Sequence, residues 1–302
     1  MITPCVYIIC GSYNELENTK KLLKCTKDQT YQNIKVIYVD DGSTDGTASY
    51  ITSYHQDVIL LKGDGKLWWT GILYKGIEKA IQLSKNNLSF ILTVNADCTF
   101  DHNFIDFLVN TSQLYNRSIV GSLVVDVRDR IRIWDAGVRI DWSKGKFISI
   151  GPKDIRSIDR SKKVEDEIDT ISTKGTLYPI EVFKKIGNFD RKNLPHYISD
   201  YEFGCRAKKA GFRLILSYQS IIYNDVLNTG FGEKIAQKIS LYDYFQLLFS
   251  RKSRINIIDN IKFIKLCCPQ KYKLKNYLFS ILKCFFLFSY VSPLFYLKRL
   301  QN

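Results

Sequence analysis

Four apolar runs in the first 95 residues each end in a cluster of acidic, amide or hydroxyl side chains, and this repeat constrains the fold more than any other feature of the chain. The runs cover residues 5–10, 34–39, 58–62 and 88–94. Helical patterns separate them, most clearly over residues 71–85, where apolar residues recur on one helical face. Strands that are apolar on both faces and alternate with helices predict an α/β fold with a mostly parallel, Rossmann-like sheet covered on both sides.

Polar residues follow all four runs, at the positions where an open parallel sheet binds its ligands. They are "GSYNE" (11–15), "DDGSTD" (40–45), "GDGK" (63–66) and "NAD" (95–97). Several carboxylates would then lie along one edge, and their mutual repulsion requires cations or hydrogen-bond donors nearby. One such turn could simply cap the next helix. The repetition instead favours a divalent cation, Mg²⁺ or Mn²⁺, held between protein carboxylates and substrate phosphates.

The pattern becomes less regular after residue 100. We expect a helix over 103–115, short strands near 118–125 and 138–142, an exposed charged loop over 153–169, a helix centred on 200–210 and a strand at 213–217. No linker divides the first 230 residues.

Four segments together resemble the family 2 glycosyltransferases, which are inverting enzymes of the GT-A fold. They are "VYIICGSYNE" (6–15), "IKVIYVDDGSTDGT" (34–47), "LTVNADCTF" (92–100) and "HYISDYEFGCRAKKAGFRL" (196–214). The resemblance covers about residues 4–225 and implies one domain over 1–230, with a nucleotide-binding half (about 1–100) and an acceptor half (about 101–230). The segment "GDGKLWWTG" (63–71) is similar to a rhamnosyltransferase-like subset that acts on dTDP-sugars.

The resemblance also implies a set of donor-binding residues in the first half of the chain. They are Ser12, Tyr13, Glu15, Asp40, Asp41, Asp64, Lys66, Trp69, Asn95, Ala96 and Asp97. Asp97 matches the last acid of the family's DxD motif and would hold the metal, whereas Asn95 replaces the first acid and could accept a ribose hydroxyl. Trp68 and Trp69 would cover the nucleotide, although plain core packing explains them equally well.

In the acceptor half, Asp200 matches the general base that deprotonates the attacking hydroxyl in an inverting reaction. Gly175 matches a close-packed glycine near the family's acceptor pocket. Glu202, two residues after Asp200, would shape the acceptor site, and His196 would line the same cleft. An alternative interpretation of this segment is a helix start at Ser199 or Asp200 with a solvated basic face. Many relatives have a His after the next strand, where this chain has Asn224 and Asp225, so the requirement for a metal is an open question.

The chain carries a formal charge of +14, of which residues 251–302 supply +10. This distribution argues against a chain-wide nucleic-acid groove. Helices are predicted over 233–249 and 254–268, and residues 277–297 form an aromatic, apolar run with one charge, Lys283. The flanking basic clusters favour a helix that lies on an anionic membrane surface. A membrane span and a buried helical hairpin are the alternatives.

The eight cysteines lack the spacing of a disulfide or metal scaffold, and the N-terminus does not resemble a signal peptide. We therefore expect a cytoplasmic protein, peripheral on the inner face of the cell membrane. The predicted activity is transfer of a sugar from dTDP-rhamnose or a UDP-hexose to a cell-surface polysaccharide or polyprenyl-linked glycan. Two alternatives are a nucleotidyltransferase, which would need a basic, Gly-rich loop where "GSYNELENTKK" stands, and a non-catalytic membrane adaptor.

Overall fold

The computed structural model describes residues 3–159, 161–225, 246–253 and 255–283. The strands are β1 (Val6–Ser12), β2 (Ile34–Asp40), β3 (Ile59–Lys62), β4 (Phe90–Thr93), β5 (Cys98–Phe100), β6 (Ile119–Asp126), β7 (Ile133–Asp135), β8 (Val138–Asp141), β9 (Lys146–Ser149), β10 (Val164–Glu165), β11 (Thr176–Pro179) and β12 (Leu214–Asn224). The helices are α1 (Leu16–Lys27), α2 (Thr47–Tyr54), α3 (Trp68–Leu83), α4 (Phe104–Leu114), α5 (Ile180–Ile186), α6 (Ser199–Lys209) and α8 (Ile257–Cys267), with a 3-10 turn η1 (Ile155–Ser157). Residues 270–283 are also helical.

The central sheet has the order β10-β12-β6-β11-β4-β1-β2-β3, with β5 beside β12 and β7 beside β6. β4, β1, β2 and β3 are parallel neighbours, as the four apolar runs predict. β11 runs antiparallel to both β4 and β6, and β12 runs parallel to β6. The carboxyl ends of β1 to β4, β6 and β12 therefore lie at one edge of the sheet, and so does the beginning of β11.

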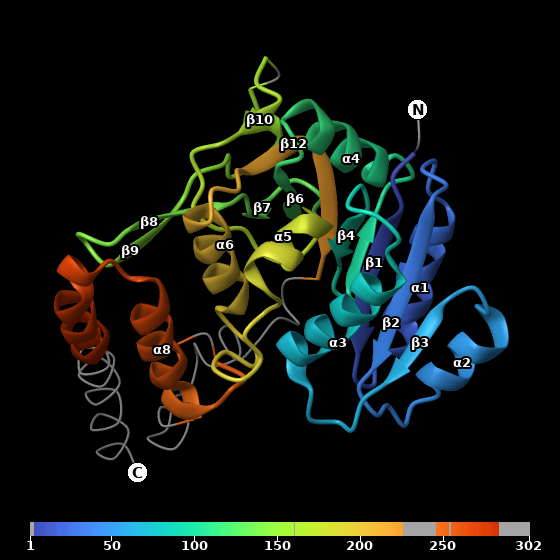
Figure 1. The fold of residues 1–302 in the computed structure, drawn as a ribbon, viewed down its shortest axis with the longest axis horizontal. Coiled ribbons are helices and arrows are strands. Elements are labelled where there is room, and N and C mark those ends of the chain that lie inside the picture. Colours follow the sequence, from blue (N-terminus) through green and yellow to red (C-terminus); the bar gives the residue numbers. More distant parts are fainter. Residues whose placement is uncertain (1–2, 160, 226–245, 254, 284–302) are drawn as a thin grey trace, which may run out of the picture.

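Helices cover both faces of this sheet (Figure 1). Alternate residues of β1 point to opposite faces, so that Val6, Ile8 and Cys10 pack in one apolar cluster and Tyr7 and Ile9 in another. The first cluster contains side chains of α1, α2 and α4, and the second contains side chains of α3, α5 and α6. The predicted α/β fold, with its mostly parallel sheet covered on both sides, is confirmed.

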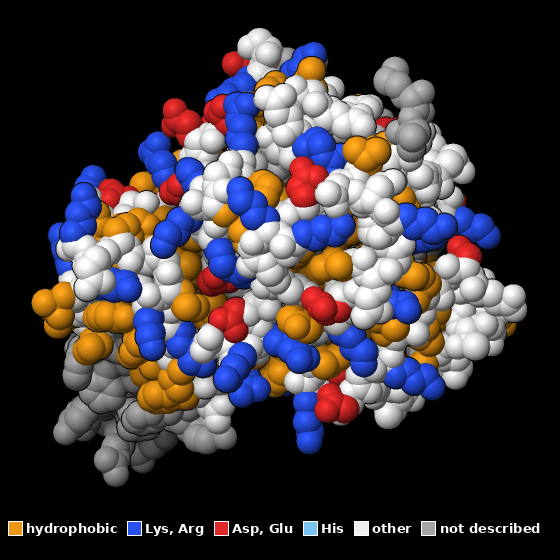
Figure 2. Space-filling view, in the orientation of Figure 1, with side chains coloured by type: hydrophobic (Ala, Val, Ile, Leu, Met, Phe, Trp, Pro, Cys, Tyr) orange, Lys and Arg blue, Asp and Glu red, His pale blue; other side chains and the backbone are white. Residues whose placement is uncertain are grey.

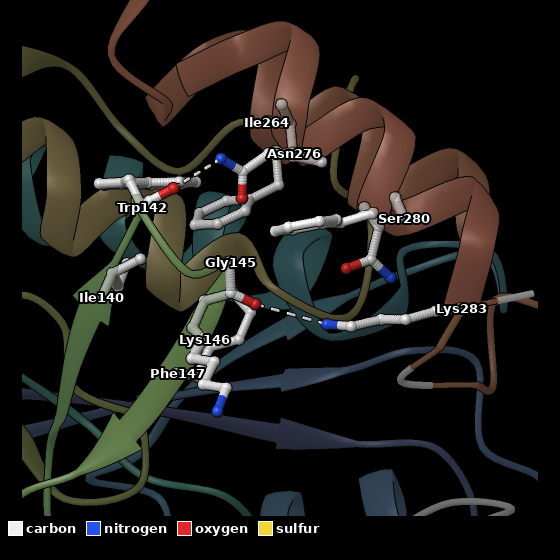
Figure 3. A pocket seen from close by; sticks show the side chains of 12 residues that line it. Ile140, Trp142, Gly145, Lys146, Phe147, Ile264, Asn276, Ser280 and Lys283 are labelled. Carbon is white, nitrogen blue, oxygen red and sulfur yellow. Dashed lines mark hydrogen bonds between the residues drawn. The ribbon is translucent and has the colours of Figure 1, made fainter. Parts of the chain in front are cut away.

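The C-terminal helices pack on the separate two-stranded hairpin of β8 and β9. The Phe263 ring of α8 stacks on that of Trp142 and lies tilted against that of Phe147, at centroid distances of 5.6 and 5.9 Å. A small pocket remains between the hairpin and the helices (Figure 3). Two hydrogen bonds join the helix over 270–283 to the hairpin beside this pocket. Asn276 Nδ2 donates to Trp142 O (2.9 Å), and Lys283 Nζ donates to Gly145 O (3.4 Å). None of the predicted site residues lines this pocket.

In the described part of the chain, no helix has the length and apolar character needed to cross a bilayer. Most of the predicted helix over 233–249 and of the apolar run over 277–297 lies outside the described residues, as does the predicted domain boundary at residue 230.

Several local predictions were wrong in detail. The helix predicted over 71–85 begins earlier, at Trp68, and the third strand is a half-buried edge strand. The strand near 138–142 pairs in the hairpin and not in the main sheet. The segment 153–169 is not simply an exposed loop, since it contains η1 and β10 and places Ile168 in the core with 1% of its surface exposed.

Candidate functional site

The polar residues predicted from the strand ends lie along one edge of the sheet. Ser12 is in register with Asp40, and Asp40 with Lys62, at the ends of β1, β2 and β3. Asn95 follows β4, and Asn224 at the end of β12 pairs with both Cys98 and Asp126. Because these strand ends are neighbours, residues from the first and last parts of the described chain meet here.

Asp41 holds the loop that follows β3. Its carboxylate oxygens accept hydrogen bonds from the backbone N–H groups of Gly65 (2.9 Å) and Leu67 (3.0 Å). Gly65 adopts φ +82°, a conformation that glycine reaches without a Cβ clash. Burial raises the pKa of Asp41 above its ordinary value. The hydrogen bonds from the backbone act in the opposite direction but have a smaller effect. Asp41 therefore shapes the predicted nucleotide-covering loop, and its placement in the nucleoside pocket remains a prediction.

The other residues predicted for the nucleoside pocket occupy the ends of β1 and β2 and the adjoining loops. Ser12 Oγ is bonded to the Tyr38 hydroxyl (2.6 Å), and Asp40 Oδ1 accepts the backbone N–H of Ser43 (3.2 Å). Tyr13 is 55% exposed, which leaves its ring accessible to a ligand.

Three more of the predicted donor residues have local partners. Glu15 Oε2 accepts a bond from Asn18 Nδ2 (2.6 Å), and Asp64 Oδ1 accepts one from the backbone N–H of Lys66 (3.1 Å). The side chain of Lys66 is itself exposed. These contacts order the loops at the sheet edge.

The sequence "NAD" lies directly beyond β4. Ala96 is buried, and Asp97 is partly exposed. The Asn95 side-chain oxygen is buried and has no hydrogen-bond partner among the residues that the structure describes. Asp97 Oδ1 accepts a weak bond from Cys98 Sγ (3.8 Å). A buried oxygen without a partner is costly, which points to a ligand group at this position.

These oxygen donors suit a divalent cation. Asp97 supplies a carboxylate, and Asn95 supplies an amide oxygen two residues earlier. Within the described ranges no group of three or more His, Cys, Asp or Glu side chains could hold an ion. A site with one carboxylate still fits Mg²⁺ or Mn²⁺, because such ions take much of their coordination from substrate phosphates and water.

Asp200 lies in the first turn of α6. Its backbone oxygen accepts a bond from Thr170 Oγ1 (3.3 Å). Tyr178 of β11 is buried, and burial raises the pKa of its hydroxyl, with the charge of Asp200 acting in the same direction. The Asp200 carboxylate therefore lies within electrostatic reach of the sheet.

Glu202, two residues further on, points to a different partner. Both of its oxygens accept bonds from Arg206 (2.7 and 2.9 Å), and Arg206 also bonds the backbone oxygens of Ile186 and Asn188. This network ties α6 to the turn after α5. The contacts give Glu202 a structural role, and the acceptor contact stays a prediction.

The segment 170–175, which we call the bridging loop, joins the two sides. Thr170 bonds Asp200, and Thr173 accepts bonds from Trp69 Nε1 (2.8 Å) and from Thr93 Oγ1 (2.8 Å) at the end of β4. Lys174 Nζ donates to Asn224 Oδ1 (2.6 Å). One short loop thus contacts the backbone of the predicted base, the predicted nucleotide cover and the end of β4, which Asp97 follows.

Gly175 ends the bridging loop, and only glycine fits there. It has φ +73°, and a Cβ would come within 2.3 Å of Ser122 Oγ and 3.0 Å of the Phe104 ring. Its backbone N–H donates to Thr93 O (2.9 Å). The close packing expected of this glycine is present.

Trp68 and Ile198 adopt left-handed backbone conformations, with φ +56° and +65°. Such values are rare for bulky residues and often occur at functional sites. The Trp68 ring lies 5.4 Å from that of His196, and Thr70 Oγ1 at the start of α3 donates to Ser199 Oγ (2.9 Å). The first turn of α3 is therefore joined to the segment that leads into α6.

His196 lies beside this junction, and its Nδ1 is buried without a partner among the described residues. Burial, together with the charge of Lys252, lowers the pKa of His196 to about 4. The ring is therefore neutral at neutral pH, which suits a hydrogen-bonding or stacking role better than an ionic one.

The comparisons with known proteins agree with this arrangement. The family model described as Glycosyl transferase family 2 matches residues 7–187, more than half of the chain. The chain belongs to glycosyl transferase family 2. It is therefore a glycosyltransferase, and the strand ends described above lie largely inside the matched region. No curated protein matches the chain.

Solved structures with the same fold include two of S. aureus TarS 1–349, one in complex with UDP and one with UDP-GlcNAc. Their TM-scores to this family 2 chain are 0.54 and 0.55 at 12% and 13% identity. The matches cover 90% of this chain and 69% and 70% of theirs. At this identity the likeness shows the GT-A-like fold.

The sequence analysis missed the roles of Lys174, Thr173 and Cys98. Lys174 and Thr173 directly precede Gly175, which the resemblance had singled out, but β11 is antiparallel. The sequence analysis considered only residues that follow a strand, because ligands bind beyond the carboxyl ends of parallel strands. An antiparallel strand runs the other way, so the residues that precede it lie at this edge. Once the antiparallel direction of β11 is known, the rule in this form identifies both residues.

Proposed function

We propose that the chain is an inverting glycosyltransferase that moves a sugar from a nucleoside diphosphate sugar to a hydroxyl of a glycan acceptor. The bridging loop carries this proposal, because its bonds link the segment of Asp200 to the end of β4, just before Asp97. An inverting reaction needs a base on one side of the anomeric carbon and charge stabilisation for the leaving diphosphate on the other.

In this mechanism the Asp200 carboxylate accepts the proton of the acceptor hydroxyl as its oxygen forms the new bond to the anomeric carbon. The bond from that carbon to the diphosphate oxygen breaks in the same step, and the configuration inverts. A divalent cation held by Asp97, with Asn95 beside it, would neutralise the developing charge on the diphosphate. Trp69, fixed by its bond to Thr173, covers the donor and excludes water.

For the donor, two observations point to a pyrimidine nucleotide. The TarS structures of the same fold hold UDP and UDP-GlcNAc, and the segment "LWWTG" (67–71) is similar to enzymes that use dTDP-rhamnose. Asp40, buried at the end of β2, would accept the N3 proton of the base. We therefore propose dTDP-rhamnose or a UDP-hexose as the donor.

A thermal-shift screen tests the function. UDP, dTDP, GDP and their sugar nucleotides should be added with and without Mn²⁺, and the melting temperature of the full chain recorded. A ligand at a hundred times its Kd stabilises by about 2.7 kcal/mol, an easily measured shift. We expect UDP or dTDP to stabilise the protein more than GDP. No shift with any nucleotide would contradict the proposal and favour a non-catalytic adaptor.

We further propose that the acceptor is lipid-linked and that the C-terminal helices hold the enzyme on the inner face of the cell membrane. Exposed apolar side chains gather on these helices beside Lys and Arg (Figure 2). They are Ile258, Ile261, Leu266, Leu274, Leu278, Ile281 and Leu282. The same helices approach the predicted acceptor side, because Lys262 Nζ of α8 donates to Asn193 O (2.9 Å), in the segment that leads to His196.

Vesicle flotation tests this attachment. The wild-type chain should float with vesicles that contain anionic phospholipid and remain free with neutral ones, since basic residues near the surface favour anionic lipid. Replacing both Leu274 and Leu278 by Glu should abolish flotation. Leu114→Glu, at an exposed apolar position on α4, is the matched control. Equal flotation of the double variant and the control would refute membrane binding by these helices.

A further inference from the structure

Lys174 lies in the bridging loop, two residues before the start of β11, at the same edge of the sheet as Asp97. Its ammonium donates to Asn224 Oδ1 at 2.6 Å, and Asn224, at the end of β12, is fully buried. Asn224 Nδ2 in turn donates to Cys98 Sγ (3.6 Å), and Cys98 Sγ to Asp97 Oδ1 (3.8 Å). A row of three contacts therefore runs from the ammonium to the carboxylate predicted to hold the metal.

The position of this ammonium is fixed by its surroundings. The Lys174 backbone oxygen accepts a bond from Ser122 Oγ (3.2 Å), and the next residue, Gly175, is packed against Ser122 and bonded to Thr93. A Lys side chain otherwise loses considerable rotamer entropy when it is ordered. Here the Asn224 bond already orders it, so a ligand that binds the ammonium meets a smaller entropic cost.

The hydrogen-bond partner of the Lys174 ammonium, the Asn224 side chain, is uncharged. The bond goes to an amide oxygen, which orients the ammonium without neutralising it. An ammonium carries three N–H donors, and this bond uses one of them. The ammonium therefore keeps its charge and two N–H donors, and its chain of contacts ends at the Asp97 carboxylate. Such an arrangement suits a diphosphate that is bound by a metal ion at Asp97 and by Lys174 at the same time.

We propose that Lys174 is a diphosphate-binding residue, whose ammonium donates to the phosphate oxygens of the nucleotide beside Asp97. The inference rests on the proposed function. Lys174 would supply part of the positive charge that stabilises the leaving diphosphate. We therefore expect the chain to bind the nucleotide with substantial affinity even when divalent ions are removed. Asn224 is then a positioning residue, which holds the ammonium at the end of β12.

The test compares nucleotides that differ only in phosphate. Affinities of the full chain for uridine and UDP, and for thymidine and dTDP, should be measured by calorimetry in EDTA, and the better-bound base used for the variants. Lys174→Met should weaken diphosphate binding about tenfold, the effect of losing one charge-assisted contact, and leave nucleoside binding unchanged. Lys174→Arg should restore most of the diphosphate affinity. Lys163→Met, at an exposed lysine, is the matched control.

Each outcome has a distinct meaning. Equal loss of nucleoside and diphosphate affinity in Lys174→Met, without rescue by Arg, would assign Lys174 a purely structural role and overturn the inference. Unchanged diphosphate affinity would overturn it as well. If the wild-type chain binds no nucleotide with or without Mn²⁺, the proposed function fails and the inference with it, whereas the first two outcomes leave the proposed function intact.

Discussion

Replacement of Asp200 by Asn is expected to lower the turnover number about a thousandfold, the range of effect of a general base. The amide has the same shape but cannot take the proton of the acceptor hydroxyl. The backbone bond from Thr170 to residue 200 does not depend on the side chain, so the loop contact should persist. Release of nucleoside diphosphate from the sugar nucleotide identified by the binding screen provides the rate.

The variant should retain the wild-type affinity for the nucleotide, because Asp200 is predicted to contact the acceptor and not the nucleotide. Calorimetry and the melting temperature check this point. Asp57→Asn, at an exposed aspartate before β3, is the matched control and should leave the rate unchanged. A variant at position 200 that keeps wild-type turnover would exclude Asp200 as the base.

Asp97→Ala is expected to lower turnover at least about a hundredfold, since charge stabilisation of a leaving diphosphate contributes several kcal/mol. In contrast to the Asp200 variant, it should also lose the stabilisation that Mn²⁺ adds to nucleotide binding. The measurement is the Kd for the nucleotide with Mn²⁺ and with EDTA, for the wild type and the variant. Asp57→Ala serves as the control for the removal of a carboxylate.

A clear result would be a wild-type Kd that depends on Mn²⁺ and an Asp97→Ala Kd that does not. If Mn²⁺ improves nucleotide binding equally in both proteins, Asp97 does not hold the ion. The two aspartates are thus separated by their effects: one variant loses turnover alone, and the other loses turnover and the response to metal.

The sequence predicted the nucleotide half of the fold well for a physical reason. Strands buried on both faces need continuous apolar runs, and β1, β2 and β4 have them. Their ends could therefore be located to within two or three residues, and the polar residues at the edge followed from the strand ends. Residues such as Asp40, Asn95 and Asp97 were found in this way.

The second half was harder to predict because its elements are short or irregular. β11 has four residues, ends in Pro179 and is inserted antiparallel between β4 and β6, which both lie much earlier in the sequence. β10 has only two residues in a charged segment, and its Glu165 is buried through a bond from Lys162 (2.7 Å). No periodic pattern marks such elements, so the position of Lys174 became visible only in the folded chain.

The bridging loop has a consequence for how enzymes of this kind diversify. Its six residues contact the segment of the predicted base, the tryptophan predicted to cover the donor and the end of β4 just before Asp97. We therefore expect an insertion there to disturb donor and acceptor binding together. A change of acceptor that preserves the donor must therefore arise elsewhere. Among the described residues, the contacts given above for the β8–β9 hairpin and for α8 involve none of the predicted donor residues. We therefore expect natural variants with new acceptors to differ in length in these two elements.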